Sequence, residues 1–293
     1  MKKTIYPILF LGLALVTTTI SAQRYGRQSK KHPAFIHTVT PAQKAQNFTK
    51  FTVASWNIGH FALGKHGDTQ LTLAQALQKQ LEYRAFLNSI NADILAILEY
   101  SPNLSNATTK DSAIVARNAV FGNYSNAQIG EKYDYNCNCL FSNGFKVIDS
   151  KQIMYSKMVQ KRYYLVTRML MGSDTVSVVA THVDWNQGEN GATYRKLQIE
   201  ELIEHFQKER FVILCADWNA KASEFDAFAR AGYSMTNHGY LGDINTYPAG
   251  DSPTSTFDNI IVKGFSINNI QIQNQPQLTD HCMIQASLTK LPL

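Results

Sequence analysis

The chain has 293 residues, of which 44% are hydrophobic, so it can form one large domain or two small ones with a sizeable core. Its formal net charge is +6, but residues 1–50 contribute +8 from Lys and Arg and contain no Asp or Glu, which leaves −2 for the remainder (6 − 8). This distribution excludes a strongly basic body, so the overall charge is no evidence for nucleic-acid binding.

The first 22 residues read as a secretory signal peptide. Lys2 and Lys3 precede an apolar stretch over 5–20, and the small residues Ser21 and Ala22 follow it. The alternative is an N-terminal membrane anchor, but the apolar run is short for a membrane span and contains threonines. We therefore predict a leader over 1–22 that is cleaved, no stable membrane span afterwards, and a secreted or periplasmic protein. Residues 23–50 are rich in Gln, Lys and Arg and are predicted to be a flexible basic arm.

The folded body is predicted over residues 51–293. In chain order it begins with a strand at 51–57, a loop, a helix at 69–90, a strand at 93–99 and a second helix at 109–120. Within the first helix, Leu73, Leu77 and Leu81 are expected to lie along one side. The short apolar run at 93–99 is typical of a central strand that is buried on both faces.

The second half is richer in strands. It continues with strands at 133–141, 147–155, 163–171 and 175–181, a helix at 192–208, a strand at 211–216, a short helix at 223–231, a long loop at 233–255, and strands at 257–262 and 282–288. The 192–208 helix is the clearest, because Ile199, Leu202, Ile203 and Phe206 fall on one face. No repeat or internal linker interrupts this order, which favours a single α/β domain of two packed sheets flanked by helices.

Polar residues occur at or near the ends of several strand-like runs. They form the motifs Trp56-Asn57, Leu98-Glu99, Thr181-His182, Asp217-Trp218-Asn219, Phe257-Asp258-Asn259 and Thr279-Asp280-His281. One such motif alone is often a solvated turn, and burying it is costly unless a charged or hydrogen-bonding group meets it. Motifs that recur from Asn57 to His281 favour one site assembled from the whole body.

The residue types in these motifs suit a hard divalent cation. The carboxylates and amides are Glu99, Asp217, Asp258, Asp280, Asn57 and Asn219. An oxygen-rich set without paired cysteines favours Mg²⁺, with Mn²⁺ or Ca²⁺ as alternatives, over a structural zinc. His182 and His281 add groups that can hold or move protons near neutral pH. This combination suits hydrolysis of phosphate esters, in which a metal neutralises phosphate oxygens while side chains handle protons.

In this order, the motifs resemble those of the endonuclease/exonuclease/phosphatase superfamily, which has the deoxyribonuclease I-like fold. The resemblance covers about residues 51–288. It implies a four-layer α/β sandwich, in which two packed mixed β-sheets are flanked by helices, and Mg²⁺-dependent cleavage of phosphate esters. Thr279 stands where the family commonly has serine, which keeps the hydroxyl. Asn57 is followed by Ile58 and Gly59 rather than by the second acidic residue of some nuclease branches, which weakens a specific match to abasic-site enzymes.

The resemblance also implies roles for the metal ligands and the water. Glu99 is the expected principal metal ligand, with Asn57 beside it and Asp280 in the same metal region. Asp217 and Asn219 are expected to position and polarise the attacking water.

The remaining implied roles concern the histidines. Asp258 is expected to orient His281, which would act as a base or a phosphate clamp. His182 is expected to bind the phosphate and assist the leaving group. Which group is the general base and which is the acid stays open at this point.

Other residues carry weaker signals. The lesser candidates for the site are His60, Trp185, Asn186, Arg195 and His238. Arg195 is also expected to make a salt bridge at its helix. Cys215 and Cys282 are predicted to be buried as small apolar side chains, and Cys137-Asn138-Cys139 lacks the second Cys or His pair that a zinc site needs.

The sequence thus predicts a secreted, divalent-metal-dependent phosphoric ester hydrolase, foremost a phosphodiesterase or endonuclease, acting as a monomer. A sphingomyelinase-like enzyme and an inositol or sugar phosphate phosphatase are alternatives, so the substrate is a nucleic acid, a phospholipid head group or a small phosphate ester. The body shows neither a basic, aromatic-interleaved stretch for a nucleic-acid backbone nor an obvious membrane-facing apolar loop. A catalytically dead binding protein is the non-enzyme alternative, and it would predict a lost ligand or histidine.

Overall fold

The computed structural model describes residues 49–59, 73–100, 120–131, 137–186, 188–240, 242–248 and 255–292. All of them belong to the unit Pro33–Leu293, the larger of the two into which the chain divides. The predicted leader, most of the predicted arm, His60 and nearly all of the predicted helix at 109–120 lie outside the described residues.

The first β-sheet is built around the first described strand. Its strand order is β11-β12-β1-β2-β4-β3, and only the β1–β2 pairing is parallel. The bounds are β1 Lys50–Asn57, β2 Ile94–Leu98, β3 Asn126–Ile129, β4 Cys139–Ser142, β11 Phe265–Gln273 and β12 Met283–Lys290. β2 is buried at every position, as expected for a central strand.

The second β-sheet has the strand order β5-β6-β7-β8-β10-β9, and only its β7–β8 pairing is parallel. The bounds are β5 Lys146–Met154, β6 Tyr163–Met171, β7 Asp174–His182, β8 Val212–Asp217, β9 Ser234–Met235 and β10 Asp258–Lys263. The predicted hairpin between β6 and β7 is present, and Gly172 takes the left-handed conformation (φ 69°) that its turn requires.

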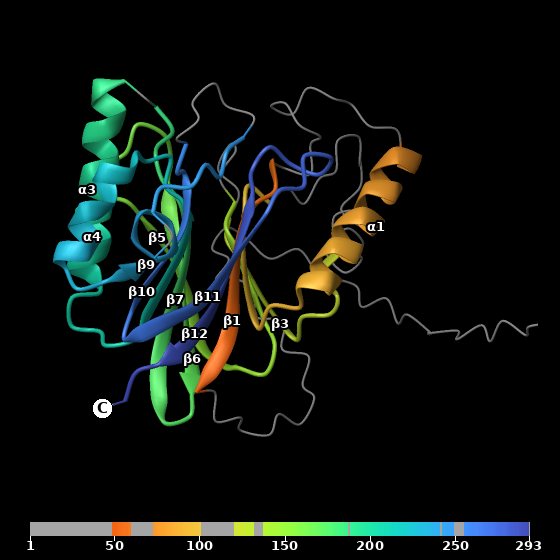
Figure 1. The fold of residues 1–293 in the computed structure, drawn as a ribbon, viewed down its shortest axis with the longest axis horizontal. Helices are drawn as coiled ribbons and strands as arrows, with labels where there is room; N and C mark the ends of the chain where they lie inside the picture. The colour runs from red at the N-terminus through yellow and green to blue at the C-terminus, as the bar shows by residue number, and fades with distance from the viewer. Residues whose placement is uncertain are drawn as a thin grey trace, which may run out of the picture. The chain divides into compact units, whose positions relative to one another are not determined.

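The sheets pack face to face, and helices cover their outer faces (Figure 1). The helical elements are α1 Leu73–Ile90, α3 Glu189–His205, η2 Ala222–Phe225, α4 Asp226–Arg230 and η3 Thr236–Tyr240. Side chains from both sheets, such as Val53 and Val178, share one buried cluster between them. A second cluster joins α1 to the first sheet, and a third joins α3 and α4 to the second sheet. The predicted four-layer α/β sandwich is therefore confirmed.

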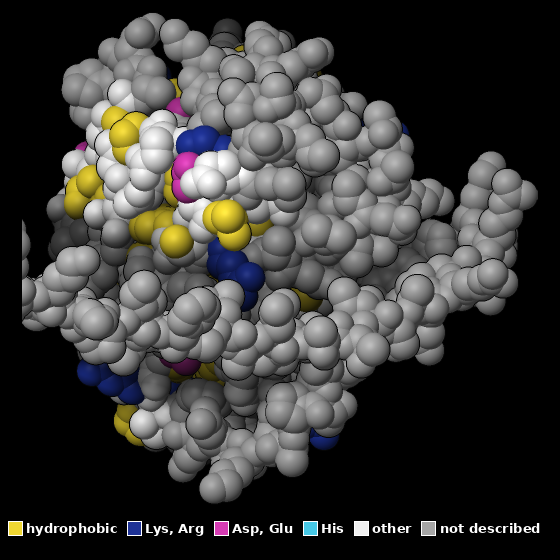
Figure 2. All heavy atoms as spheres, turned by 90° about the vertical axis from the view of Figure 1, so that its right-hand side faces the viewer, with side chains coloured by type: hydrophobic (Ala, Val, Ile, Leu, Met, Phe, Trp, Pro, Cys, Tyr) yellow, Lys and Arg dark blue, Asp and Glu magenta, His cyan; other side chains and the backbone are white. Residues whose placement is uncertain are grey.

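The buried side of α1 differs from the prediction. Leu81 is 57% exposed, whereas Tyr83 and Leu87 are buried. The reason is that Tyr83 and Phe86 pack their rings against Trp56, with centroids 5.4 Å and 5.0 Å away, and this turns Leu81 outward. The side chains of Leu73 and Leu77 lie outside the described residues. Figure 2 shows the outer face on the α1 side, where apolar, basic and acidic side chains are mixed.

Three strands were not predicted, namely β3, β9 and β11. β11 is an edge strand whose register shifts between Ile267 and Asn269, so its apolar residues do not alternate cleanly. The strand predicted at 133–141 begins only at Cys139 in the described part of the chain. Cys215 and Cys282 are buried as predicted. None of the described helices is long and apolar enough to cross a membrane.

Candidate functional site

The strand pairings bring the predicted motifs to one end of both sheets. In the first sheet, the parallel register pairs Asn57 with Leu98, which places Glu99 directly beyond the end of β2. In the second sheet, parallel pairing sets His182 beside Asp217, and antiparallel pairing sets Asp258 on the other side of Asp217. The ends of separate strands thus bring these polar side chains together at one end of the two sheets.

A first group of possible ligands consists of Glu99, His182 and Asp217, whose ligand atoms all lie within 4.8 Å of one another. His182 Nδ1 is 3.5 Å from Glu99 Oε1, and His182 Nε2 is 3.5 Å from Asp217 Oδ2. The group therefore spans both sheets, because Glu99 comes from the first and the other two come from the second.

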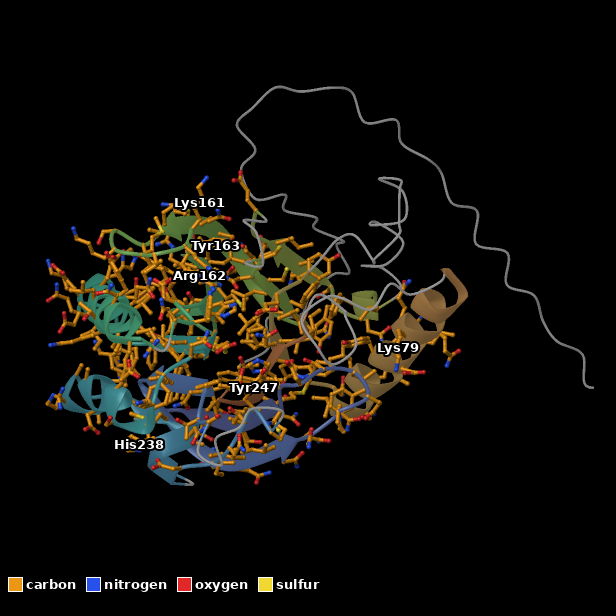
Figure 3. All side chains as sticks on the ribbon, turned by 90° about the horizontal axis from the view of Figure 1, so that it is seen from above. Lys79, Lys161, Arg162, Tyr163, His238 and Tyr247 are labelled. Carbon is orange, nitrogen blue, oxygen red and sulfur yellow. The ribbon has the colours of Figure 1, made fainter. Side chains whose placement is uncertain are left out.

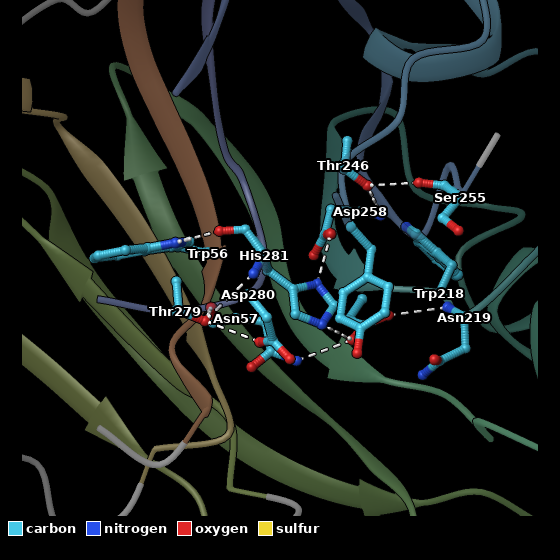
Figure 4. Close-up of polar contacts among 12 residues, drawn as sticks. Trp56, Asn57, Trp218, Asn219, Thr246, Ser255, Asp258, Thr279, Asp280 and His281 are labelled. Carbon is cyan, nitrogen blue, oxygen red and sulfur yellow. Dashed lines mark hydrogen bonds and ion pairs between the residues drawn. The ribbon is translucent and has the colours of Figure 1, made fainter. Parts of the chain in front are cut away.

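A second group consists of Asp217, Asp258 and His281, again within 4.8 Å. His281 Nδ1 lies 2.8 Å from Asp258 Oδ2, and His281 Nε2 lies 3.7 Å from Asp217 Oδ2 (Figure 4). Asp217 belongs to both groups and is almost fully buried. It is the residue on which the site is centred.

Two amides orient this centre. Asn57 Nδ2 donates to Asp217 Oδ2 over 2.9 Å, while Asn57 Oδ1 accepts the backbone N–H of Gly59 at 3.0 Å. The backbone N–H of Asn219 donates to Asp217 Oδ1 over 3.0 Å. Asn219 Nδ2 lies 2.9 Å from His182 Nε2, and an amide nitrogen can only donate. The His182 proton therefore lies on Nδ1, toward Glu99.

Two of these residues have an uncommon backbone conformation. Glu99 has φ 53° and Asn219 has φ 48°, both in the left-handed region. Residues other than glycine enter this region at a cost of about 1–3 kcal/mol, and they persist there where the surroundings dictate it, often at functional sites. The backbone turns at these positions direct both side chains toward His182.

Solved structures share this arrangement of sheets and helices. The chain matches an endonuclease/exonuclease/phosphatase from Bacteroides vulgatus with a TM-score of 0.63 and 17% identity, covering 83% of this chain and 99% of that one. A protein of the same description from Beutenbergia cavernae DSM 12333 matches with a TM-score of 0.63 and 14% identity, covering 83% and 72%. D. rerio TDP2 complexed with single strand DNA product matches with a TM-score of 0.63 and 15% identity, covering 83% and 100%.

This chain has the endonuclease/exonuclease/phosphatase fold. No family model matches its sequence, and no curated protein matches it either. At these identities the likeness concerns the fold, so the chemistry of the site has to be argued from its own residues.

Within the endonuclease/exonuclease/phosphatase fold, the electrostatics of the site are set by burial and by crowded carboxylates. Burial raises the pKa of Glu99 to about 7; the His281 charge opposes this rise, and Asp217 adds to it. Burial alone would lower the pKa of His281, but Asp258 and Asp217 outweigh it and raise this pKa well above the ordinary value. Burial raises the pKa of Asp258 as well, and the His281 charge opposes that rise, so each member of the pair affects the protonation of the other.

The Thr279-Asp280-His281 motif is hydrogen-bonded to β1. Thr279 Oγ1 donates to the backbone carbonyl of Asn57 over 3.0 Å, and Trp56 Nε1 donates to the carbonyl of His281 over 3.2 Å. Asp280, which is half-buried, belongs to neither of the two ligand groups found among the described residues. It lies beside them, since its charge contributes to raising the pKa of His281.

The lesser candidates are less central. Arg195 is buried and pairs with Glu224 at 3.0 Å, so its salt bridge is present but its partner lies in η2. The backbone carbonyl of Asn186 accepts from Arg195 Nη1, and Trp185 is 54% exposed. His238 lies between Asp243 and Asp226, whose carboxylates are 2.6 Å and 3.1 Å from its ring nitrogens. The contacts of Arg195 and His238 therefore join neighbouring segments of the fold.

Two residues at the site were not singled out from the sequence. Arg162 is buried directly before β6, and its charge lowers the pKa of Glu99. Tyr247 packs its ring against His281, with centroids 4.7 Å apart. A lone Arg before a strand carries no distinctive signal, whereas Tyr247 lies in the 233–255 loop, whose length is itself typical of a functional segment. Both are labelled in Figure 3.

Proposed function

We propose that the protein is a divalent-metal-dependent phosphoric ester hydrolase, foremost a phosphodiesterase or endonuclease. The observation that carries the proposal is the shared position of Asp217 in two groups of ligand atoms, one with Glu99 and His182 and one with Asp258 and His281. Buried acids and histidines with perturbed pKa values, gathered at strand ends, are typical of a catalytic site.

The residues present fit a hard cation. Glu99, Asp217 and Asp280 supply carboxylate oxygens, the ligands that Mg²⁺ prefers, with Mn²⁺ and Ca²⁺ as substitutes. The pKa of Glu99 is raised to about 7 because burial disfavours its charge. A nearby cation favours the charged carboxylate, so the residue is suited to hold one. When bound, Mg²⁺ would supply Lewis-acid neutralisation of phosphate oxygens.

The amides and carboxylates of the chain would orient water. Asp217 accepts from the Asn57 side chain and the Asn219 backbone, so its carboxylate has a fixed orientation, as a group that positions a water nucleophile would need. Asn57 has been predicted as a metal-side ligand, and in the present hydrogen bonds its amide nitrogen faces Asp217. We therefore assign Asn57 the orientation of that carboxylate beside the metal region.

The two histidines would handle the phosphate and the protons. His281, positively charged and paired with Asp258, can hold a phosphate oxygen or, after losing its proton, accept one from water. His182, held by Asn219 with its Nδ1 proton toward Glu99, can bind the phosphate and assist the leaving oxygen. The buried charge of Arg162 adds a further attraction for an anionic substrate.

A substrate panel tests the proposal. Plasmid DNA, RNA, sphingomyelin, inositol phosphates and bis-p-nitrophenyl phosphate are incubated with the protein in Mg²⁺ and in chelator. We expect metal-dependent cleavage of the phosphodiesters, and a nuclease would show strong salt dependence because it contacts several phosphates. Cleavage of sphingomyelin or inositol phosphates alone would favour the alternatives within the same fold. Absence of turnover on every substrate would leave a binding protein on this scaffold, whereas turnover that chelator does not reduce would contradict the metal dependence.

We also propose that the protein is exported and monomeric. The support for export is the sequence pattern over 1–22, followed by the basic arm over 23–50 that precedes the 51–293 domain. N-terminal sequencing of the protein from the periplasm or medium would give a start near Gln23. Sedimentation velocity would give a single species of monomer mass. Recovery only in the cytoplasm with Met1 intact would contradict export.

A further inference from the structure

Tyr163 is a fully buried residue that joins the two sheets and has no assigned role so far. It begins β6 in the second sheet, next to Arg162 (Figure 3). Its hydroxyl accepts the backbone N–H of Asn138 over 2.8 Å, and its carbonyl accepts from Asn138 Nδ2 over 3.2 Å. Asn138 directly precedes β4 of the first sheet. The hydroxyl and the backbone of one tyrosine therefore both hold the same residue of the opposite sheet.

The segment that Tyr163 holds lies alongside Glu99. Beyond the end of the β2–β4 pairing, the N–H of Tyr100 donates to the carbonyl of Cys137 over 3.0 Å. Glu99 is the residue before Tyr100, and Cys137 is the residue before Asn138. The left-handed backbone of Glu99 (φ 53°) is one that residues other than glycine keep only where their surroundings impose it. The position of the 137–139 segment therefore helps to determine where the Glu99 carboxylate lies.

The backbone of Tyr163 is also bonded to the strand that carries His182. Thr181 Oγ1 donates to the Tyr163 carbonyl over 2.9 Å, and the β6–β7 register sets Tyr164 opposite Thr181. His182 follows Thr181, and its Nδ1 is 3.5 Å from Glu99 Oε1. Tyr163 is thus joined to the chain on both sides of this pair, in the first sheet beside Glu99 and in the second sheet beside His182.

Gly130 leaves room for the Tyr163 hydroxyl. A Cβ atom at this position would overlap with Tyr163 Oη. The N–H of Gly130 donates to the carbonyl of Asn138 over 3.0 Å, so the glycine and the hydroxyl hold Asn138 together. Because the interior is close-packed, the buried tyrosine has little space into which it could move aside. A methyl group at Gly130 is therefore expected to displace the hydroxyl from Asn138.

Resting on the proposed function, we propose that Tyr163 is a positioning residue that sets the spacing between Glu99 and His182. Its hydroxyl holds the first-sheet segment beside Glu99, and its backbone holds the second-sheet strand that ends in His182. It acts through Asn138 rather than by touching the ion or the substrate. Removing an outer partner of a metal site typically changes metal affinity or activity by about 10–100-fold. Tyr163→Phe removes the hydroxyl and keeps the ring and the backbone, so it loosens only the side of Glu99.

The test measures Mn²⁺ binding to the full chain by electron paramagnetic resonance, together with the Mg²⁺ dependence of turnover on a phosphate ester that the wild type hydrolyses. Because Glu99 is the expected principal ligand, we expect Tyr163→Phe to weaken Mn²⁺ binding by about 10-fold. The Mg²⁺ concentration for half-maximal rate should rise by the same factor, and excess Mg²⁺ should restore kcat. Gly130→Ala should show the same shifts. Tyr164→Phe is the matched control, because this neighbouring hydroxyl contacts His205 over 3.2 Å instead, and it should behave as wild type.

The outcomes separate this inference from the function on which it rests. A wild-type protein that neither binds Mn²⁺ nor hydrolyses any phosphate ester would overturn both. A wild-type enzyme whose Tyr163→Phe variant binds Mn²⁺ equally well would overturn the inference alone, and so would equal weakening in Tyr164→Phe. If Tyr163→Phe does not fold, Gly130→Ala decides, and unchanged Mn²⁺ affinity in that variant would overturn the inference. Weak binding with a lowered melting temperature, which excess metal does not rescue, would mean a general structural defect and would also overturn it.

Discussion

The side chains of Asn57 and Asp217 are 160 positions apart in the sequence, yet Asn57 Nδ2 lies 2.9 Å from Asp217 Oδ2. Asn57 ends β1 in the first sheet, and Asp217 ends β8 in the second. This hydrogen bond therefore joins the two sheets within the candidate site, and the geometry of the site depends on how the sheets are aligned.

Replacing Asn57 tests that dependence. Asn57→Ala removes the donor to a buried carboxylate, so we expect about a 100-fold lower kcat, as a misplaced catalytic group can cost this much. The free energy of unfolding should fall by about 1–3 kcal/mol, because an acceptor of Asp217 loses its partner. Steady-state kinetics and urea unfolding check both values. Asn268→Ala, which removes an exposed bond to Thr289, is the control and should leave kcat unchanged.

We expect His281 and Glu99 to be needed for turnover but not for folding. We expect His281→Ala and Glu99→Ala each to reduce turnover by at least about 10²–10⁴-fold, the range for losing general acid–base or charge-stabilising groups. Circular dichroism should show the same fold as wild type. His205→Ala is the control, since His205 contacts Tyr164 on the outer face of the second sheet. Wild-type rates in His281→Ala and Glu99→Ala would remove these roles.

Metal binding should raise the thermal stability of the protein. A ligand at 100 times its dissociation constant stabilises the folded state by about 2.7 kcal/mol, so added Mg²⁺ or Mn²⁺ should raise the melting temperature. Chelator should reverse the rise and stop turnover together. Glu99→Ala should melt at the same temperature with and without metal. A metal-induced rise that survives in Glu99→Ala would place the ion elsewhere.

The titration of His238 should make the stability of the protein depend on pH. Burial lowers its pKa, but hydrogen bonds and charges from Asp243 and Asp226 outweigh this and raise the pKa above the ordinary 6.5. The stabilisation from these contacts is therefore complete below about pH 6.5 and is lost as the pH rises through the higher folded-state value. Calorimetry across this range should show a fall in melting temperature that is missing in His238→Asn. Asn suits the test because it tolerates the left-handed backbone at this position (φ 62°).

Much of the fold and the location of the candidate site followed from the sequence. The burial of α3 through Ile199, Leu202 and Phe206 follows from strict helical spacing. The polar residues near strand ends could be recognised as one site because each interrupts an apolar run. Asn57 and Glu99 lie at the ends of neighbouring parallel strands, so the ends of these strands meet at one edge of the first sheet. Asp217 ends β8 in the second sheet, and the packing of the two sheets brings it to Asn57.

The remaining features depend on tertiary contacts that a local pattern does not contain. Leu81 fits the apolar spacing of α1, but aromatic packing of Tyr83 and Phe86 on Trp56 decides which side is buried. β11 is hidden by its bulge and its polar edge position. The contact of the Tyr247 ring with His281 joins residues more than thirty positions apart.

The pairing of β1 with β12 has a consequence for folding. Trp56 donates to the carbonyl of His281 across 225 positions, and Thr279 donates to the backbone carbonyl of Asn57, so β1 and β12 must meet before the centre exists. A partly folded chain in which these two strands are still separate therefore lacks the assembled centre, however complete its other elements are.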